Sequence, residues 1–168
     1  MDFDVDALYA ALDAQRQARG LTWTELGREI NGQFQRASVR AISVSTITGM
    51  RKRGVIEGDG VLQMLRWLGR TPESFVPGHK AATSESALPH ARQGQILRFD
   101  ARAIHAALDA QRAERGMTWT QVAAEIGGCA APSLTRLAKG GRTGFPEVVR
   151  IARWLGRPVA SLTRLSDW

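Results

Sequence analysis

Apolar residues recur every three or four positions along most of the chain, a spacing that is typical of amphipathic helices. The first such stretch contains Val5, Leu8 and Leu12, and we expect Asp4 to cap its amino end near residue 4. Phe3, just before the cap, is then placed to pack onto Leu8. No stretch shows the pattern of a half-buried strand, so the sequence predicts an all-α protein.

The same pattern returns later in the chain. Residues 3–30 match residues 99–126 at a constant offset of 96, with 17 of 28 positions identical, and the segment RWLGR at 66–70 recurs at 153–157, an offset of 87. The first copy therefore carries nine extra residues between these matches. Two long copies indicate a tandem pair of domains and not a solenoid, which needs at least about three stacked units.

We therefore predict two small domains, residues 1–76 and 99–168, with an insert at 31–43 in the first. Residues 77–98 lack helical periodicity and are rich in Pro, Gly, Ser and Ala, a composition that predicts a flexible linker. A domain of about 70 residues buries only a small core, so each copy should be moderately stable by itself.

Each copy has signals for about five short helices. The second helix begins with a capping box, formed by Thr22 with Glu25 in one copy and by Thr118 with Gln121 in the other. The third helix should begin at Ser43 or Ser45 and run to about Lys52, and in the second copy it should begin at 131–132, where Pro suits a first helical turn. The fourth covers about 60–68 and 147–155, and a brief fifth starts at 71–72 and at 158.

Charge narrows the class of partner. The net charge is +7 and the isoelectric point is about 10.9, and basic residues gather at the same place in each copy, at the end of the third helix and just after it. A cluster of this kind that occurs twice favours a polyanion as partner. A solvated basic surface that serves solubility is the alternative.

Other chemistries find little support in the sequence. Cys129 is the only cysteine, which excludes an intrachain disulfide and a cysteine-based zinc site, and the three histidines are scattered. No Ser-His-Asp set, carboxylate pair or glycine-rich phosphate loop repeats or clusters, so we expect neither an enzyme nor a metal or cofactor. No apolar run approaches the roughly 18 residues of a membrane span, and the amino terminus is acidic, so we expect no membrane and a cytoplasmic location.

Two ordered motifs occur in each copy. The first copy has RQARGLTWTELG at 16–27 and SVSTITGMRKRG at 43–54, and the second has RAERGMTWTQVA at 112–123 and PSLTRLAKG at 132–140. In order and spacing they resemble the Cro and lambda-repressor type of helix-turn-helix protein, the XRE-like family. The resemblance covers nearly all of both copies and implies two lambda-repressor-like helix-turn-helix domains.

The resemblance implies that the third helix of each copy enters the DNA major groove, while the start of the second helix and the loop after the third hold phosphates. Small hydroxyl side chains would let that helix approach base edges, and Arg136 can bind guanine through two hydrogen bonds. The candidate DNA-binding residues are Thr22, Trp23, Arg40, Ser43, Ser45, Thr46, Thr48, Arg51, Lys52 and Arg53 in the first copy, and Thr118, Trp119, Ser133, Thr135, Arg136, Lys139 and Arg142 in the second.

Two features depart from the family pattern. Trp23 and Trp119 stand where the family often has Gln, and two roles are open to them: contact with the DNA backbone or burial against the third helix. The turn is also longer, above all in the first copy. There the insert could extend the second helix, contact nucleic acid through Gln33, Arg36 and Arg40, or only cover the core.

A third departure bears on specificity, because Gly49 stands at the position of Arg136 and the first copy lacks the best base reader. We therefore expect a bacterial or phage transcriptional regulator, a repressor in the simplest case, that binds an asymmetric double-stranded DNA site with two unequal heads. A longer site is expected if the chain also forms a homodimer. The alternative is a protein-interaction adaptor, antitoxin-like or a phage-encoded inhibitor, on the same fold. We expect a nucleoid-associated protein without a small-molecule effector, since no ligand-binding domain is evident.

Overall fold

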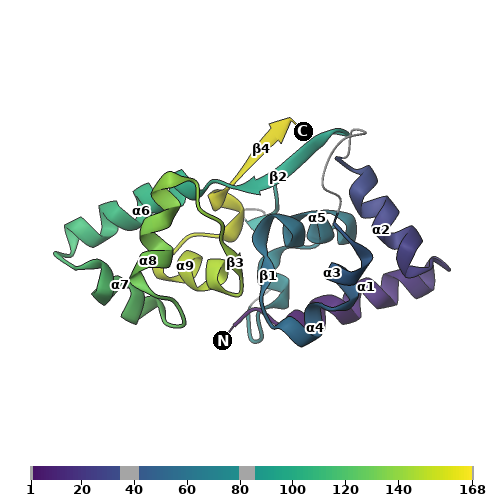
Figure 1. Ribbon diagram of the computed structural model, residues 1–168, viewed down its shortest axis with the longest axis horizontal. Helices are drawn as coiled ribbons and strands as arrows, with labels where there is room; N and C mark the ends of the chain where they lie inside the picture. Colours follow the sequence, from purple (N-terminus) through teal and green to yellow (C-terminus); the bar gives the residue numbers. More distant parts are fainter. Residues whose placement is uncertain (1, 35–41, 80–85, 168) are drawn as a thin grey trace.

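The computed structural model describes residues 2–34, 42–79 and 86–167, and these residues are mostly helical, as expected (Figure 1). The first copy contains α1 (Val5–Ala18), α2 (Trp23–Gly32), α3 (Val44–Thr48), α4 (Met50–Arg53), β1 (Ile56–Glu57), α5 (Gly58–Leu68) and the 3₁₀ helix η1 (Pro72–Phe75). The second contains β2 (Gln95–Phe99), α6 (Ala101–Glu114), α7 (Trp119–Ile126), α8 (Ala131–Thr135), the 3₁₀ helix η3 (Arg136–Lys139), β3 (Gly144–Phe145), α9 (Glu147–Leu155), the 3₁₀ helix η4 (Val159–Leu162) and β4 (Thr163–Asp167). We call these two sets of elements the first and the second module.

The starts of the first two helices in each module confirm the sequence predictions. The Asp4 side chain accepts a hydrogen bond from the Ala7 N–H (2.9 Å), and Asp100 does the same for Ala103 (3.0 Å). Both predicted capping boxes are formed, at α2 and at α7, and Phe3 is buried beside the first cap. These bonds satisfy amide groups that the end of a helix leaves without partners.

The third helix of the first module differs from the prediction. We expected one helix from Ser43 or Ser45 to about Lys52, but it is divided at Gly49 into α3 and α4. Glycine disfavours a continuous helix, but it is not the cause of the break, because Arg136 stands at the equivalent position. In the second module α8 passes into the 3₁₀ helix η3 at the same place. The segment predicted to read DNA is therefore two short helical pieces in each module.

The prediction of a purely α-helical protein is wrong in one respect, because two small antiparallel sheets join distant segments. β1 pairs with β3, and β2 pairs with β4. A strand of two residues, such as β1, is too short to show alternation. The longer β2 lacks the alternation of buried and exposed residues that marks a strand, because the adjacent Ile96 and Leu97 are both buried, on opposite faces.

The β1–β3 ladder joins equivalent positions of the two modules. At the offset of 87, Glu57 corresponds to Gly144, and these two residues face each other in the ladder. Pairing of a residue with its own equivalent is what a two-fold axis through the ladder produces. Figure 1 shows α3 and α4 on one side of the ladder and α8 on the other. The two copies are therefore arranged as a pseudo-symmetric pair within one chain.

Three phenylalanines fill the junction between the modules. The ring of Phe145, at the end of β3, lies 4.6 Å from the ring of Phe3 and 5.8 Å from that of Phe99, measured between centroids. All three rings are buried and belong to one apolar cluster that runs through both modules. Because burial of large aromatic rings is strongly favourable, the junction is a shared core and not a surface contact.

Gly58 stands at the position that corresponds to Phe145 at the offset of 87. A Cβ atom there would lie 2.6 Å from the Phe99 ring and 2.7 Å from the carbonyl oxygen of Thr143. The Gly58 N–H donates a hydrogen bond to that same carbonyl (2.9 Å), which holds the two backbones close together. One side of the pseudo-axis thus carries a large ring, and the other carries no side chain.

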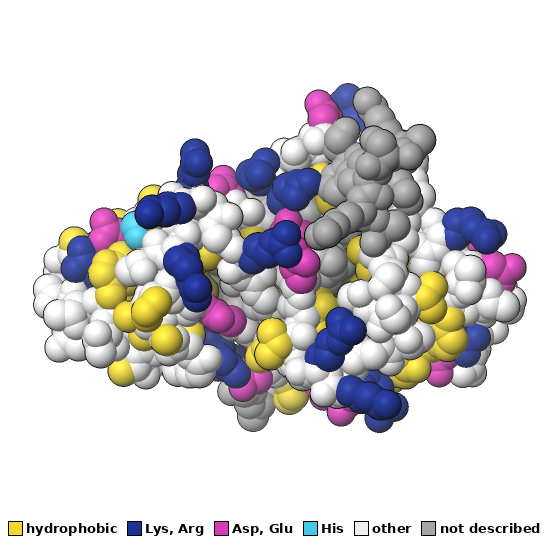
Figure 2. Space-filling model, viewed as in Figure 1, with side chains coloured by type: hydrophobic (Ala, Val, Ile, Leu, Met, Phe, Trp, Pro, Cys, Tyr) yellow, Lys and Arg dark blue, Asp and Glu magenta, His cyan; other side chains and the backbone are white. Residues whose placement is uncertain are grey.

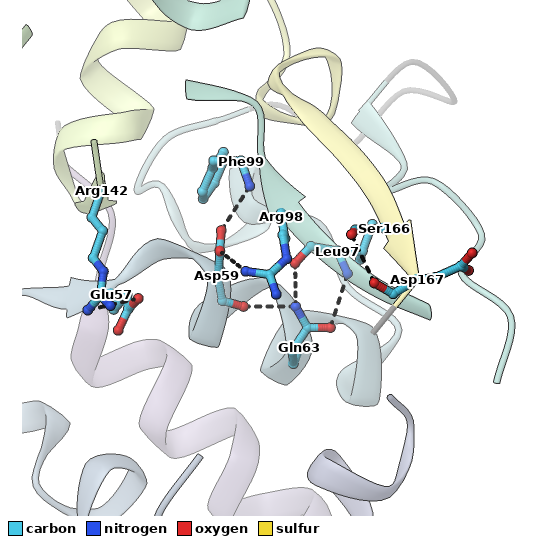
Figure 3. Close-up of polar contacts among 9 residues, drawn as sticks. All are labelled: Glu57, Asp59, Gln63, Leu97, Arg98, Phe99, Arg142, Ser166 and Asp167. Carbon is cyan, nitrogen blue, oxygen red and sulfur yellow. Dashed lines mark hydrogen bonds and ion pairs between the residues drawn. The ribbon is translucent and has the colours of Figure 1, made fainter. Parts of the chain in front are cut away.

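The segment before the first helix of each module crosses to the other module. Asp2 pairs with Arg150 of α9 (2.8 Å), and the Gln63 side chain of α5 donates a hydrogen bond to the Leu97 carbonyl (2.6 Å), as Figure 3 shows for the second contact. Gln63 and Arg150 are equivalent at the offset of 87. The segments that precede α1 and α6 thus each bind the other module in a pseudo-symmetric way. The first is held by an ion pair with Arg150 and the second by a hydrogen bond from the Gln63 amide.

Within the predicted flexible linker the structure describes residues 77–79 and 86–98, and residues 91–95 bind the first module. The Arg66 guanidinium donates hydrogen bonds to the carbonyls of residues 91, 92 and 95 at 2.7–3.1 Å. The Gly94 N–H binds the Gln33 carbonyl (3.1 Å), and Ser86 is buried. Where the sequence predicted a flexible linker, the backbone of these residues thus has partners within the protein.

The close contact at Gly58 gives a stability prediction. Gly58→Ala should lower the free energy of unfolding by about 1–3 kcal/mol, because the added methyl group meets a backbone oxygen that cannot move without opening the β1–β3 ladder. Urea denaturation measures this change.

Gly60→Ala in the same helix is the matched control. A Cβ at Gly60 has nothing within 4 Å, and alanine is the better helix former, so this variant should be as stable as the parent or up to about 1 kcal/mol more stable. Equal effects of the two substitutions would contradict the close packing at the junction.

Candidate nucleic-acid interface

In the first module a long connection joins α2 and α3. Ile30 and Ile47 pack inside it and are fully buried. The Asn31 side chain closes the connection, because its nitrogen donates to the Ile42 carbonyl (2.9 Å) and its oxygen accepts from the Ile42 N–H (2.7 Å). This pair of bonds fixes α3 relative to α2, although residues 35–41 of the insert lie outside the described residues.

The described part of the insert covers the core. The Gln33 side chain donates to the Gln63 carbonyl (3.2 Å), so it faces α5 and not the surface that α3 presents. Phe34 is almost completely buried. Of the three residues proposed to contact nucleic acid from the insert, Gln33 is thus engaged elsewhere, and Arg36 and Arg40 lie outside the described residues.

In the second module the connection is short and depends on two glycines. Gly127 and Gly128 have φ angles of +77° and +67°, a region of backbone space that other residues rarely adopt. A Cβ at Gly128 would also overlap the guanidinium of Arg150. The tight turn lets α8 follow α7 within a few residues, which is the arrangement that the sequence predicted for this module.

The exposed part of α3 carries short hydroxyl side chains. Ser43 accepts a hydrogen bond from the Thr46 N–H (3.1 Å), and its hydroxyl lies 2.9 Å from that of Ser45 and 2.8 Å from that of Thr46. Thr48 donates back to the Val44 carbonyl (3.0 Å). The four predicted contacts of α3 thus stand at or near the surface, and three of them form one cluster of hydroxyl groups.

The corresponding part of the second module is basic. Thr135, Arg136 and Lys139 are exposed, and Ser133 is half-buried with its hydroxyl donating to the Ala130 carbonyl (2.7 Å). Among the described residues the charged groups of Arg136 and Lys139 make no hydrogen bond or close ion pair, although the charge of Arg136 helps to lower the pKa of Glu147. Their charged groups are therefore available to an external partner, as their predicted roles require.

The two tryptophans, for which contact with DNA and burial against the third helix were both predicted as possible roles, stack on rings of the first helix. Trp23 stacks on Tyr9 of α1 with ring centroids 5.2 Å apart, and Trp119 stacks on His105 of α6 at 5.0 Å. Both indoles therefore pack on the first helix of their module. Each ring remains half-exposed, so contact with a DNA backbone stays a prediction.

The threonines that cap α2 and α7 are exposed, with their hydroxyls 3.2 Å from the N–H groups of Glu25 and Gln121. A helix start of this kind attracts anions, because free N–H groups and the helix dipole both favour negative charge there. Thr22 and Thr118 thus remain suitable phosphate contacts at the edge of each helix-turn-helix unit.

The basic residues after the third helix differ in their partners. Arg51 pairs with Asp6 (3.1 Å) and lies over the Tyr9 ring, while Lys52 and Arg53 are exposed on α4. In the second module Arg142 pairs with Glu57 across the junction (3.5 Å). These ion pairs are largely exposed and therefore weak, so a phosphate group could replace the carboxylate at small cost.

Figure 2 shows how charge is distributed over the face that carries the β1–β3 ladder. Lys and Arg side chains are spread over both modules on this face, and Asp and Glu side chains lie among them near the middle. Both signs of charge therefore occur along the whole face, at the two ends as well as at the junction.

Both modules contain a set of interactions among Trp, Glu and Arg side chains that was not predicted from the sequence. The Trp67 indole N–H donates to Glu29 (2.9 Å), which also binds Arg19, and hydrogen bonds from Trp67 and then Arg19 lower the pKa of the Glu29 carboxyl. Trp154, Glu125 and Arg115 repeat this arrangement in the second module. The signal was present in the sequence, since all three residue types recur at equivalent positions in the two copies.

A second missed feature is the carboxyl of Asp59 at the junction. It accepts a hydrogen bond from the Phe99 N–H (2.8 Å) and lies 3.6 Å from the Arg98 guanidinium (Figure 3). Burial raises the pKa of Asp59, and the bond from Phe99 and the charge of Arg98 only partly offset this effect. No pattern in the sequence pointed to this residue, because its partners lie about 40 positions away.

No protein-family model matches the sequence, and no curated protein or solved structure matches the chain. Within the described residues no helix is long and apolar enough to cross a membrane. The same residues contain no cluster of three or more His, Cys, Asp or Glu side chains that could hold a metal ion.

The raised pKa of Asp59 predicts how stability depends on pH. The folded state holds this proton more tightly than the unfolded chain, so the contribution of Asp59 to stability is present at low pH and is lost as the pH rises through the pKa of the folded state. Asp59→Asn keeps an oxygen for the Phe99 N–H and removes the titration. The variant should therefore gain stability relative to the parent as the pH rises from about 3.5 to 7.

Urea denaturation over this pH range measures the difference in unfolding free energy, with Asp167→Asn at the exposed end of β4 as the control. A difference between Asp59→Asn and the parent that stays constant with pH, or shrinks as the pH rises, would show that burial does not govern this carboxyl.

Proposed function

We propose that the chain is a sequence-specific double-stranded DNA-binding transcriptional regulator, in the simplest case a repressor, that uses two unequal helix-turn-helix heads. Each head consists of a capped helix, a turn and a short third helix, in the order found in Cro and lambda-repressor-like proteins. A helix of this kind fits the major groove, while residues around it hold phosphates.

The observation that carries the proposal is the position of α3 and α8 on opposite sides of a ladder that pairs equivalent residues (Figure 1). Dimeric helix-turn-helix proteins use a two-fold axis to present two such helices to successive major grooves, about 34 Å apart along the DNA. In this chain the pseudo-axis lies within one molecule. A single chain could therefore occupy two half-sites, and no second copy is required.

The two heads present different chemistry to the proposed DNA. α3 offers a cluster of hydroxyl groups, whereas η3 offers the exposed guanidinium of Arg136. Hydroxyl groups can donate to or accept from several bases, but a guanidinium prefers guanine. The proposed site is therefore asymmetric, with a guanine contact expected in only one half.

A second function is favoured by one observation: Arg51 of the first module is already paired with Asp6 and the hydroxyl groups of α3 are bonded to one another. Such a surface also suits a protein partner, so the chain could be an adaptor or an antitoxin-like inhibitor. In that case the partner would bind without DNA and would stay bound at high salt.

Salt dependence separates the two functions. If about 6 to 10 phosphates are contacted, the affinity for DNA fragments selected from a random pool should fall by about 10³- to 10⁵-fold between 50 and 200 mM salt. Fluorescence anisotropy over a salt series measures this slope. No selected sequence, or a selected sequence bound no better than random DNA at all salt concentrations, would count against the regulator and for the adaptor.

Two substitutions in η3 test the roles within the second head. Arg136→Ala should reduce the preference for the selected site over random DNA, by about 1–3 kcal/mol, because a base contact is lost. Lys139→Ala should weaken binding to all sequences alike and reduce the salt slope by about one. If Arg136→Ala instead weakened all sequences equally, Arg136 would be a phosphate contact and not a base reader.

A further inference from the structure

A cavity of about 500 Å³ lies between the two modules, where β2 and β4 meet the start of α6 and the loop that leads into β3. Cavities of about 300–1,000 Å³ are typical of small-molecule sites. Four arginines line this one, each from a different segment: Arg98, Arg102, Arg142 and Arg164.

The two arginines of the β2–β4 sheet stand in an unfavourable pair. Arg98 and Arg164 face each other directly across the two strands, and like charges in that position destabilise an antiparallel pair. Arg98 is compensated by Asp59 at 3.6 Å. Among the described residues the guanidinium of Arg164 makes no hydrogen bond or close ion pair, although its charge helps to lower the pKa of Asp59, and the guanidinium of Arg102 on α6 likewise has no such bond. The cavity thus holds two guanidinium groups without a bonded partner.

Three carboxylates also line the cavity, but each is engaged by the protein. Glu57 pairs with Arg142 (3.5 Å), and Asp59 accepts from the Phe99 N–H. Asp100 caps α6 through the Ala103 N–H (3.0 Å). With four arginines against three occupied carboxylates, the lining keeps an excess of positive charge and unused donors.

The start of α6 adds to this excess. The N–H groups of the first residues of a helix have no partner within it, and Ala101 and Arg102 of this 14-residue helix lie on the cavity. The positive end of the helix dipole therefore points to the same space as the two unpartnered guanidinium groups.

We propose that this cavity binds a small molecule that carries a phosphate-type group, with Arg102, Arg164 and the start of α6 as its main contacts. A dianion placed there removes the repulsion between Arg98 and Arg164 and supplies acceptors to the open donors. These contacts all belong to the second module, and the first module adds Glu57 and Asp59 to the lining. This departs from the expectation, drawn from the sequence, that no small-molecule effector exists.

The proposal goes beyond the DNA-binding function and does not depend on it, because the ligand binds the protein alone. The probe is inorganic pyrophosphate, titrated into the full chain by isothermal calorimetry without DNA, with sodium chloride of equal ionic strength as the blank. Saturable binding with one site per chain is expected. Arg102→Gln and Arg164→Gln should each weaken it by roughly tenfold, the loss that one charge-assisted hydrogen bond accounts for.

Arg157→Gln is the matched control, since Arg157 is an exposed arginine of the second module that does not line this cavity. It should leave pyrophosphate binding unchanged, and thermal unfolding should show that all three variants fold. No saturable binding in the millimolar range, or equal binding by the parent and Arg164→Gln, would overturn the proposal. It would also be overturned if pyrophosphate did not bind while Arg164→Gln weakened binding to every DNA, because Arg164 would then contact the DNA backbone.

Discussion

The packing of Phe145 against Phe3 and Phe99 sets the position of one module relative to the other, and the rest of the interface depends on it. The ring is fully buried where the backbones of β1 and β3 come together. α4 ends three residues before β1, and η3 ends five residues before β3, so each predicted reading segment is tied to the junction by a very short length of chain. A change in the aromatic core would therefore move the two segments relative to each other.

Much of the local structure followed from the sequence because it depends on neighbours within a few positions. The caps at Asp4 and Thr22 and the apolar faces of the long helices are of this kind. The sheets could not be predicted in the same way. β2 binds β4 about 65 positions away, and its five residues carry no alternating pattern that would mark them as a strand. Segment 86–98 looked like a flexible linker because its composition is that of a loop, whereas Arg66 supplies its order from outside.

Within the candidate site, too, features set by neighbouring residues could be predicted, and features set by distant residues could not. The exposure of Arg136 and Lys139 could be predicted from their spacing relative to the buried Leu134 and Leu137, since helical periodicity separates the inner from the outer face. The stacking of Trp23 on Tyr9 could not, because it depends on how two helices cross. A comparison of the copies contains part of the missing information: Tyr9 and His105 are both flat rings at one equivalent position, opposite a tryptophan in each module.

The contrast between Gly58 and Phe145 has a consequence for how such a pair can be built. In a dimer of identical subunits a residue on the axis meets its own copy, so any enlargement occurs twice and must be accommodated twice. Here Phe145 places a large ring beside the axis in one half, and Gly58 has no side chain at the equivalent position of the other half. Only two unlike partners can divide the space in this way. Each half therefore fits the other better than a copy of itself: a pair of two second modules would carry a large ring on both sides of the axis, and a pair of two first modules would carry a ring on neither side.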